Sequence, residues 1–123
     1  MFELNLLIKK ERGKMKTQVM TFKINKSYEH WEKNFDSHRE IQAAAGMTPL
    51  YRGRSEDDPQ KVCIVVRMAD EEKAANFMEE NKDAILESGH ILETTERTVY
   101  IGWITEIILV CYFMIKKLMG FNL

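Results

Sequence analysis

The stretch KVCIVVRMA, residues 61–69, decides the fold because it is short and rich in β-branched residues. Such a run is typical of a β-strand, whose successive side chains point to opposite faces of the sheet. One face carries Val62, Ile64, Val66 and Met68, and the other carries Cys63 and Val65. An antiparallel sheet with one wet face alternates apolar with polar residues, whereas both faces of this strand are apolar. We therefore expect both faces of the sheet to be covered.

Helices can cover one face of this strand, and the second face needs another partner. Two-fold self-association is the commonest soluble assembly, so we predict a homodimer that packs sheet against sheet. The alternative is a central strand that is merely rich in valine and leaves an apolar patch exposed.

The segments before this strand have regular patterns. KTQVMTFKIN (16–25) is β-prone, and NKSYEHWEKNFDSHREIQAAAG (25–46) is helical, with Ser27 as its N-cap and Gly46 as its end. MTPLYRGRSEDDPQ (47–60) is typical of a strand that runs into a turn. The inward stripe of the helix comprises Trp31, Phe35, His38, Ile41 or Gln42, and Ala45.

The segments after the strand complete the pattern. DEEKAANFMEENKDAILESG (70–89) predicts a helix capped by Asp70 and ended by Gly89, with Asn81 as a candidate break, and HILETTERTVYIG (90–102) predicts the last strand. The order β-α-β-β-α-β predicts an α+β, ferredoxin-like fold, with a four-stranded antiparallel sheet and two helices on one face. The predicted parts are a loose leader (1–15), the ferredoxin-like domain (16–101) and an apolar C-terminal extension (102–123).

Composition excludes several classes of protein. Eighteen basic and nineteen acidic residues give a formal net charge of -1, without the concentrated basic excess that a nucleic-acid partner needs. Cys63 and Cys111 lie in apolar runs, which favours buried thiols, and no cysteine–histidine cluster has metal spacing. We expect neither a metal nor a cofactor.

The N-terminal segment MFELNLLIKKERGK (1–14) places its apolar patch before its charges. A secretory signal has the opposite order, so we predict a cytoplasmic protein. The leader is either a loose extension or an artefact of a start at Met1 in place of Met15.

Three segments resemble an uncharacterised family of small proteins found mainly in marine cyanobacteria and marine metagenomes. They are TFKINKSYEHWEKNFDS (21–37), GMTPLYRGRSEDDPQKV (46–62) and ESGHILETTERTVY (87–100). That family is similar in fold to the dimeric α/β-barrel superfamily, in which two ferredoxin-like protomers join their sheets. The resemblance implies a homodimer but carries no catalytic residues, because the family has no established activity. The wider superfamily includes cofactor-free and haem-degrading monooxygenases and small-ligand binders, and fold alone does not choose among them.

The residues themselves suggest a pocket between the sheet and the helices. We expect it to be lined by Trp31, Phe35, His38, Tyr51, Met68 and Phe77, with Arg52 and His90 at its mouth. An apolar pocket with a single imidazole can orient a ligand, or His38 can act as a general base near neutral pH. Each of these residues also has a structural interpretation. Trp31 and Phe35 have core spacing, both histidines can bond to the backbone, and Arg52 can pair with Glu93 or Glu96.

The extension GWITEIILVCYFMIKKLMGF (102–121) is the most hydrophobic stretch of the chain. Its uninterrupted apolar part, residues 107–115, is shorter than the span of about 20 residues that crosses a bilayer. It is therefore a membrane-associated helix, a helix packed on the domain or its partner, or a disordered end.

Three functions remain open. We favour a non-catalytic homodimer that binds a small ligand in the pocket. The alternatives are a cofactor-independent monooxygenase or isomerase that uses His38, and an interaction protein that the C-terminal extension recruits to a partner or membrane. The sequence does not identify the ligand, the reaction or the cellular process.

Overall fold

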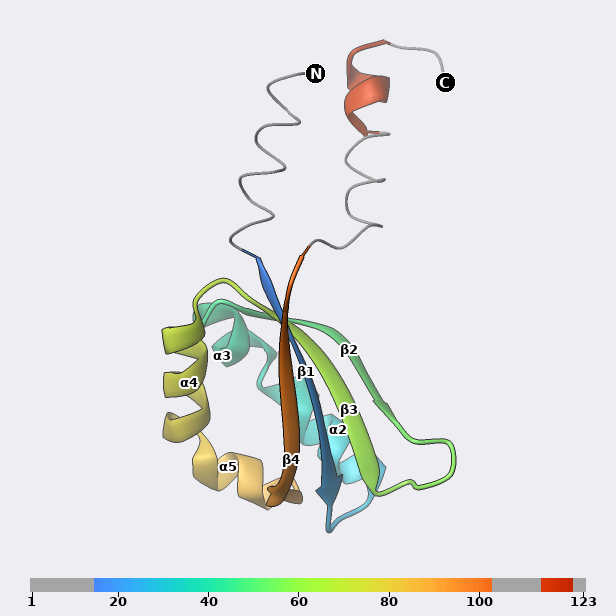
Figure 1. Ribbon diagram of the computed structural model, residues 1–123, viewed down its shortest axis with the longest axis vertical. Helices are drawn as coiled ribbons and strands as arrows, with labels where there is room; N and C mark the ends of the chain where they lie inside the picture. The colour runs from blue at the N-terminus through green and yellow to red at the C-terminus, as the bar shows by residue number, and fades with distance from the viewer. Residues whose placement is uncertain (1–14, 103–113, 121–123) are drawn as a thin grey trace.

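The computed structural model of the chain describes residues 15–102 and 114–120. Its elements follow one another as in Figure 1. They are β1 (Lys16–Ile24), α2 (Tyr28–Ser37), α3 (Arg39–Ala44), β2 (Met47–Arg54), β3 (Lys61–Met68), α4 (Glu71–Glu80), α5 (Lys82–Glu87) and β4 (His90–Ile101). The leader before Met15 and residues 103–113 of the extension lie outside the described residues.

The four strands form one antiparallel sheet in the order β2-β3-β1-β4. This order and the helical connections α2–α3 and α4–α5 make the ferredoxin-like βαββαβ fold, so the predicted fold class is confirmed. The central pair β1–β3 is regular along its whole length, from Lys16 opposite Met68 to Lys23 opposite Lys61. These two strands therefore form the rigid base of the molecule.

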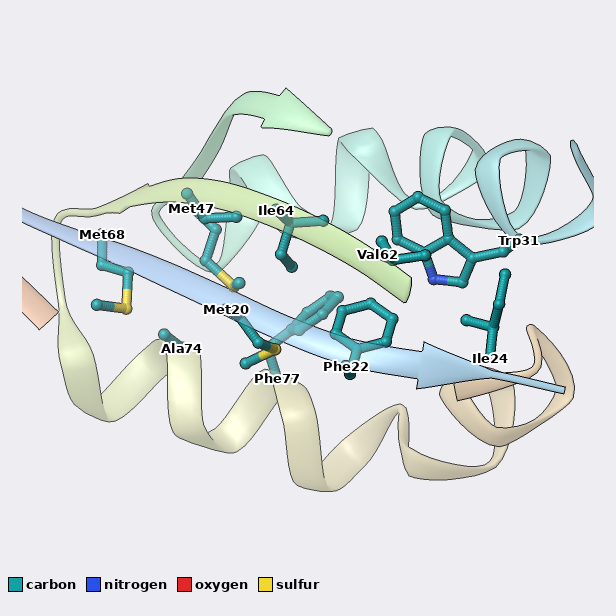
Figure 2. Close-up of a cluster of buried hydrophobic side chains, with 11 residues drawn as sticks. Met20, Phe22, Ile24, Trp31, Met47, Val62, Ile64, Met68, Ala74 and Phe77 are labelled. Atoms are coloured by element: carbon teal, nitrogen blue, oxygen red, sulfur yellow. The ribbon is translucent and has the colours of Figure 1, made fainter. Parts of the chain in front are cut away.

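The core lies between the sheet and its helices. The predicted alternation of β3 is confirmed, because Val62, Ile64, Val66 and Met68 are all buried on the helix side. Figure 2 shows this side of the sheet, with Trp31 at one end of the core, Met68 at the other and Phe77 between them. On the opposite face Val65 and Cys63 are only half-buried, so Cys63 is not the fully buried thiol that the sequence suggested.

The first helical segment is interrupted at His38, which the sequence did not predict. In an unbroken helix the Asn34 carbonyl would accept from the backbone N–H of His38. Here that carbonyl accepts instead from the Ser37 hydroxyl at 2.7 Å and from His38 Nδ1 at 2.6 Å. The backbone N–H of His38 bonds to the Phe35 carbonyl at 3.2 Å. Two side chains thus displace one helical hydrogen bond and separate α2 from α3.

The second helical segment is interrupted at Asn81, where the sequence predicted a break. The side-chain amide of Asn81 donates to the Phe77 carbonyl at 2.9 Å, and α5 starts at the next residue. At the start of α4 the Asp70 carboxylate accepts from the backbone N–H groups of Glu72 and Lys73, which confirms the predicted N-cap.

Both outer strands carry an irregularity. The pairing of β2 with β3 shifts between Pro49 and Tyr51, and the pairing of β4 with β1 shifts between the partners of Thr21 and Lys23. In β2 the shift leaves Tyr51 opposite Val65, on the face away from the helices. A bulge of this kind redirects the side chains that follow it.

The described part of the C-terminal extension is short. Residues 114–118 are helical, and no helix within residues 15–102 and 114–120 is long and apolar enough to cross a membrane. Because residues 103–113 are outside the described residues, the choice among a membrane-associated, packed or disordered extension stays a prediction.

Candidate ligand-binding cavity

A cavity of about 60 Å³ lies between the sheet and the two helical connections. Its sheet wall is made by residues of β1, β3 and the starts of β2 and β4, and its helix wall by residues of all four helices. The helix wall includes half-buried residues such as Asn34, Met78, Asn81 and Ile85. The cavity is therefore enclosed by the sheet and borders the surface among the helices.

Aromatic rings form one end of the cavity. The Trp31 ring is 2% exposed and lies 5.0 Å from the Phe35 ring in a stacked arrangement. It meets the Phe22 ring edge-on at 5.7 Å, and Phe22 in turn stacks on the imidazole of His90 at 3.7 Å. These contacts hold a continuous apolar surface against which a planar or aliphatic group can pack.

His38 lines the cavity at the junction of α2 and α3. Its Nδ1 lies 2.6 Å from the Asn34 carbonyl oxygen, so Nδ1 carries a proton and donates it. In the neutral imidazole this arrangement leaves Nε2 as an acceptor, with no hydrogen-bond partner within residues 15–102 and 114–120. The interruption of the helix thus fixes the ring and leaves one nitrogen available to a ligand.

His90 lies on the sheet wall, where β4 begins directly after Gly89. It is 5% exposed and shares a 2.7 Å hydrogen bond with the Thr95 hydroxyl, which the irregularity of β4 brings beneath it. Burial lowers the pKa of His90 from 6.5 to about 4. At neutral pH His90 is therefore an uncharged wall of the cavity.

Two glutamines face the cavity from opposite walls, and each is 5% exposed. Gln18 on β1 accepts a hydrogen bond from Nε of Arg97 through its Oε1. Gln42 on α3 is different, because its Oε1 is buried without a partner and its side chain bonds to no residue of the described chain. Sequence reasoning placed Gln42 on the inward stripe as an alternative to Ile41 but did not propose it as a site residue.

The predicted site residues separate into two groups. Trp31, Phe35, His38, Phe77 and His90 line the cavity together. Three others do not, and the prediction that they line or border the pocket is wrong: Tyr51, Arg52 and Met68.

Tyr51 and Met68 lie outside the cavity for different physical reasons. The bulge in β2 turns Tyr51 to the opposite face of the sheet, where its side chain lies over Gly53 and is 54% exposed. Met68 is buried in the core at the far end of β3, opposite Met47 and Lys16. The position of Tyr51 was not visible from the alternation of residues, because a bulge shifts the alternation by one. The alternation placed Met68 on the correct face, but it did not show that Met68 lies beyond the end of the cavity.

Arg52 forms an ion-pair cluster between β2 and α2. Its guanidinium donates two hydrogen bonds to Asp36, at 2.7 and 2.8 Å, and one to Glu32 at 2.7 Å. The bond from Arg52 lowers the pKa of the Asp36 carboxyl. The alternative that Arg52 pairs with Glu93 or Glu96 is wrong, since β2 and β4 are at opposite edges of the sheet.

A second, more open hollow of about 280 Å³ lies between α3 and α4. It shares Phe77 and Asn81 with the cavity, and Ile41, 49% exposed, lies on its other side. The exposure of Ile41 corrects the alternative that it points inward, a place that Gln42 takes. The two spaces therefore adjoin each other at Phe77 and Asn81.

The described residues offer little for metal chemistry. No group of three or more His, Cys, Asp and Glu side chains is placed to hold a metal ion within residues 15–102 and 114–120. The chemistry available in the cavity is hydrogen bonding by neutral groups and proton transfer at His38.

Comparison with known proteins gives a family and a fold. A family model described as "Domain of unknown function (DUF3764)" matches residues 15–102. No curated protein matches the chain.

Several solved structures are similar in fold at low identity. A protein of Nitrosomonas europaea, provisionally described as an antibiotic biosynthesis monooxygenase, has a TM-score of 0.56 at 16% identity, covering 73% of this chain and 91% of its own. SnoaB of Streptomyces nogalater, a cofactor-independent oxygenase, has a TM-score of 0.54 at 14% identity. The match covers 71% of this chain and 91% of SnoaB. A nipsnap family protein of unknown function from Agrobacterium tumefaciens has a TM-score of 0.50 at 13% identity. The match covers 72% of this chain and 87% of that protein. At these identities the similarities show a shared ferredoxin-like βαββαβ fold.

Proposed function

The chain belongs to the DUF3764 family, a domain of unknown function, and we propose that it binds a small ligand in the cavity between sheet and helices. The observation that carries the proposal is the combination of an apolar wall with polar groups that have no partner among the described residues, namely Nε2 of His38 and the amide of Gln42. Binding sites typically combine a mostly apolar surface with a few well-placed polar groups.

The side chains of the cavity walls can move to accommodate a ligand. Three methionines, Met20, Met47 and Met78, face the space. Methionine side chains are unbranched and flexible, so they can move to fit a ligand larger than the free volume.

The marine cyanobacterial distribution that the resemblance implied stays a prediction.

A thermal-shift screen of small molecules on the full chain tests the proposal, because a ligand that binds only the folded state raises its melting temperature. The decisive variant is Ala84→Leu, which fills the cavity from α5 and should abolish the shift given by any hit. The matched control is Ala75→Leu, an exposed position of α4 that does not line the cavity. A hit that shifts Ala84→Leu as much as the unmodified protein binds elsewhere and contradicts the proposal.

A second candidate is a cofactor-independent oxygenase or isomerase, and the geometry of His38 favours it. The free Nε2 can remove a proton from an acidic C–H or O–H of a bound ligand, with Nδ1 held by the Asn34 carbonyl. SnoaB, a cofactor-independent oxygenase, has a similar fold, which is why this class of enzyme is a candidate. The variant His38→Asn should then lose turnover while retaining ligand binding. Unchanged turnover would exclude His38 as the base.

We also propose that two copies pack their sheets together. The face away from the helices presents half-buried Val19 and Val65 beside exposed Tyr51 and Tyr100. Light scattering on the full chain should give twice the chain mass, and Val65→Asp should give the monomer. Ala43→Asp, on an exposed helical position, should remain dimeric. A monomeric unmodified chain would refute the dimer.

A further inference from the structure

Among residues 15–102 and 114–120, the amide oxygen of Gln42 is a buried polar atom that the fold leaves without a hydrogen bond. Gln42 is 5% exposed, it lines the cavity, and its Oε1 has no partner in the part of the chain that the structure describes. Leaving a buried polar group unpaired is unfavourable, because the group loses its bonds to water without replacing them. Gln18 shows that the same side chain at the same depth can be given a partner, because Arg97 donates to it. The lone amide therefore points to a partner that comes from outside the chain.

The charge of the cavity limits what that partner can be. Among the described residues, its lining includes glutamine, asparagine, serine and histidine but no lysine, arginine, aspartate or glutamate, and the guanidinium of Arg97 is engaged by Gln18. Burial also keeps His90 neutral, with its pKa at about 4. An ionised ligand would lose its hydration without gaining a counter-charge, which is strongly unfavourable. The cavity thus favours an uncharged ligand.

The apolar part of the cavity indicates the rest of the ligand. The stacked rings of Trp31 and Phe35 lie 5.0 Å apart at one end, and methionines surround the space. Flat apolar groups pack well on aromatic surfaces, and the methionines allow the free space of about 60 Å³ to widen for a single ring.

We propose, on the basis of the ligand-binding function above, that Gln42 is a specificity residue that recognises the hydroxyl group of a small, uncharged, ring-containing ligand. A hydroxyl can both donate and accept, so it satisfies the amide in either orientation of its oxygen and nitrogen. The ring packs against the aromatic end of the cavity, and charged analogues are excluded because nothing in the lining compensates their charge.

Three probes separate the parts of this proposal, with binding to the full chain measured by calorimetry at neutral pH. Phenol carries the ring and the hydroxyl, toluene carries the ring alone, and benzoate carries a negative charge. One hydrogen bond to a buried amide corresponds to about fivefold to tenfold in affinity. We therefore expect phenol to bind about fivefold to tenfold more tightly than toluene, and benzoate not to bind.

The variant Gln42→Met should bind phenol and toluene equally, because methionine keeps the length of the side chain without the amide. The matched control Gln60→Met lies in the exposed turn before β3 and should keep the preference for phenol. Gln42→Leu provides a second apolar replacement if the methionine variant does not fold.

The outcomes distinguish this proposal from the one on which it rests. Equal binding of phenol and toluene to the unmodified protein would mean that water satisfies Gln42, and it would overturn the specificity role while leaving a ligand-binding cavity. A preference for phenol that survives in both Gln42 variants would also overturn it. Tight binding of benzoate would refute the exclusion of charge. Failure of phenol and toluene to bind at all would overturn the proposal for a ring with a hydroxyl, whereas the ligand-binding proposal is decided by the thermal-shift screen with Ala84→Leu.

Discussion

The sheet wall and the helix wall enclose the same cavity of about 60 Å³, yet they are built differently. On the sheet wall, Gln18 has Arg97 as its partner, and His90 shares a hydrogen bond with Thr95. On the helix wall, Gln42 has no partner within the described chain, and His38 leaves Nε2 open. Both walls contain buried polar groups, but only one of them satisfies its groups internally.

We infer from this difference that the sheet wall supports the cavity and that the helix wall offers the groups that a ligand can bind. The regular pairing of β1 with β3 fixes the sheet wall, whereas the helix wall is interrupted at His38 and again at Asn81. At each interruption a side chain bonds to a backbone carbonyl in the preceding turn. A wall made of short helices can adjust to a ligand more readily than a hydrogen-bonded sheet can.

The largest expected effect compares one phenylalanine from each wall. Phe22→Ala removes a ring that is 2% exposed and contacts Trp31 and His90, so it should lower the free energy of unfolding by about 4 kcal/mol. Phe35→Ala removes a half-buried ring and should cost about half as much. Urea unfolding of both variants measures the difference. Equal costs would remove the distinction between a rigid and an adjustable wall.

The next effect concerns pH and the sheet wall. The unfolded chain protonates His90 below its ordinary pKa of 6.5, but the folded protein does so only near pH 4. The free energy of unfolding should therefore fall as pH drops from 6.5 to about 4, by about 3 kcal/mol in total, and level off below that. His90→Gln should lack this loss in urea unfolding measured across the same pH range. An identical pH profile in the variant would show that His90 does not cause it.

A smaller and opposite pair of effects separates the two glutamines. Gln18→Met should destabilise the fold by about 1–3 kcal/mol because Arg97 loses its acceptor. Gln42→Met removes an amide that has no partner among the described residues, and it should leave the stability unchanged or raise it by about 1 kcal/mol. Melting temperatures of the two variants are the measurement. A large loss in Gln42→Met would mean that the amide already has a structural partner.

The smallest effect is expected outside the cavity, at the cluster of Arg52, Asp36 and Glu32. These side chains are about one-third exposed or more, so water and salt screen their attraction. Arg52→Gln should therefore cost at most about 1 kcal/mol, and less at high salt. Because Arg52 lowers the pKa of Asp36, its contribution is present above pH 3.8 and is lost as pH falls below it. A larger cost that is insensitive to salt would contradict this surface role.

The fold was predictable because its information is local. The alternation in β3, the N-cap at Asp70 and the stop at Gly89 each depend on neighbouring residues in the chain. Gly89, for example, adopts a φ of 102°, a conformation that favours glycine, directly before β4. The order of such elements was enough to identify a ferredoxin-like fold.

The cavity was less predictable because its details depend on irregularities. The bulge in β2 moved Tyr51 to the other face, and the interruption at His38 gave Gln42 the inward position in place of Ile41. The absence of a partner for Gln42 within the described chain is a property of three-dimensional packing. Its one trace in the sequence is a polar residue on an otherwise apolar helical stripe.

The bulges have a further consequence, for aggregation. In the order β2-β3-β1-β4 the outer strands are β2 and β4, and each has an interrupted register, whereas the inner pair has none. In β2 the interruption follows Pro49, which has no N–H to offer a neighbouring chain. An added strand would need an unbroken row of donors and acceptors along one of these edges. Both edges of the sheet therefore resist growth into a fibril, while its broad face remains free to pair.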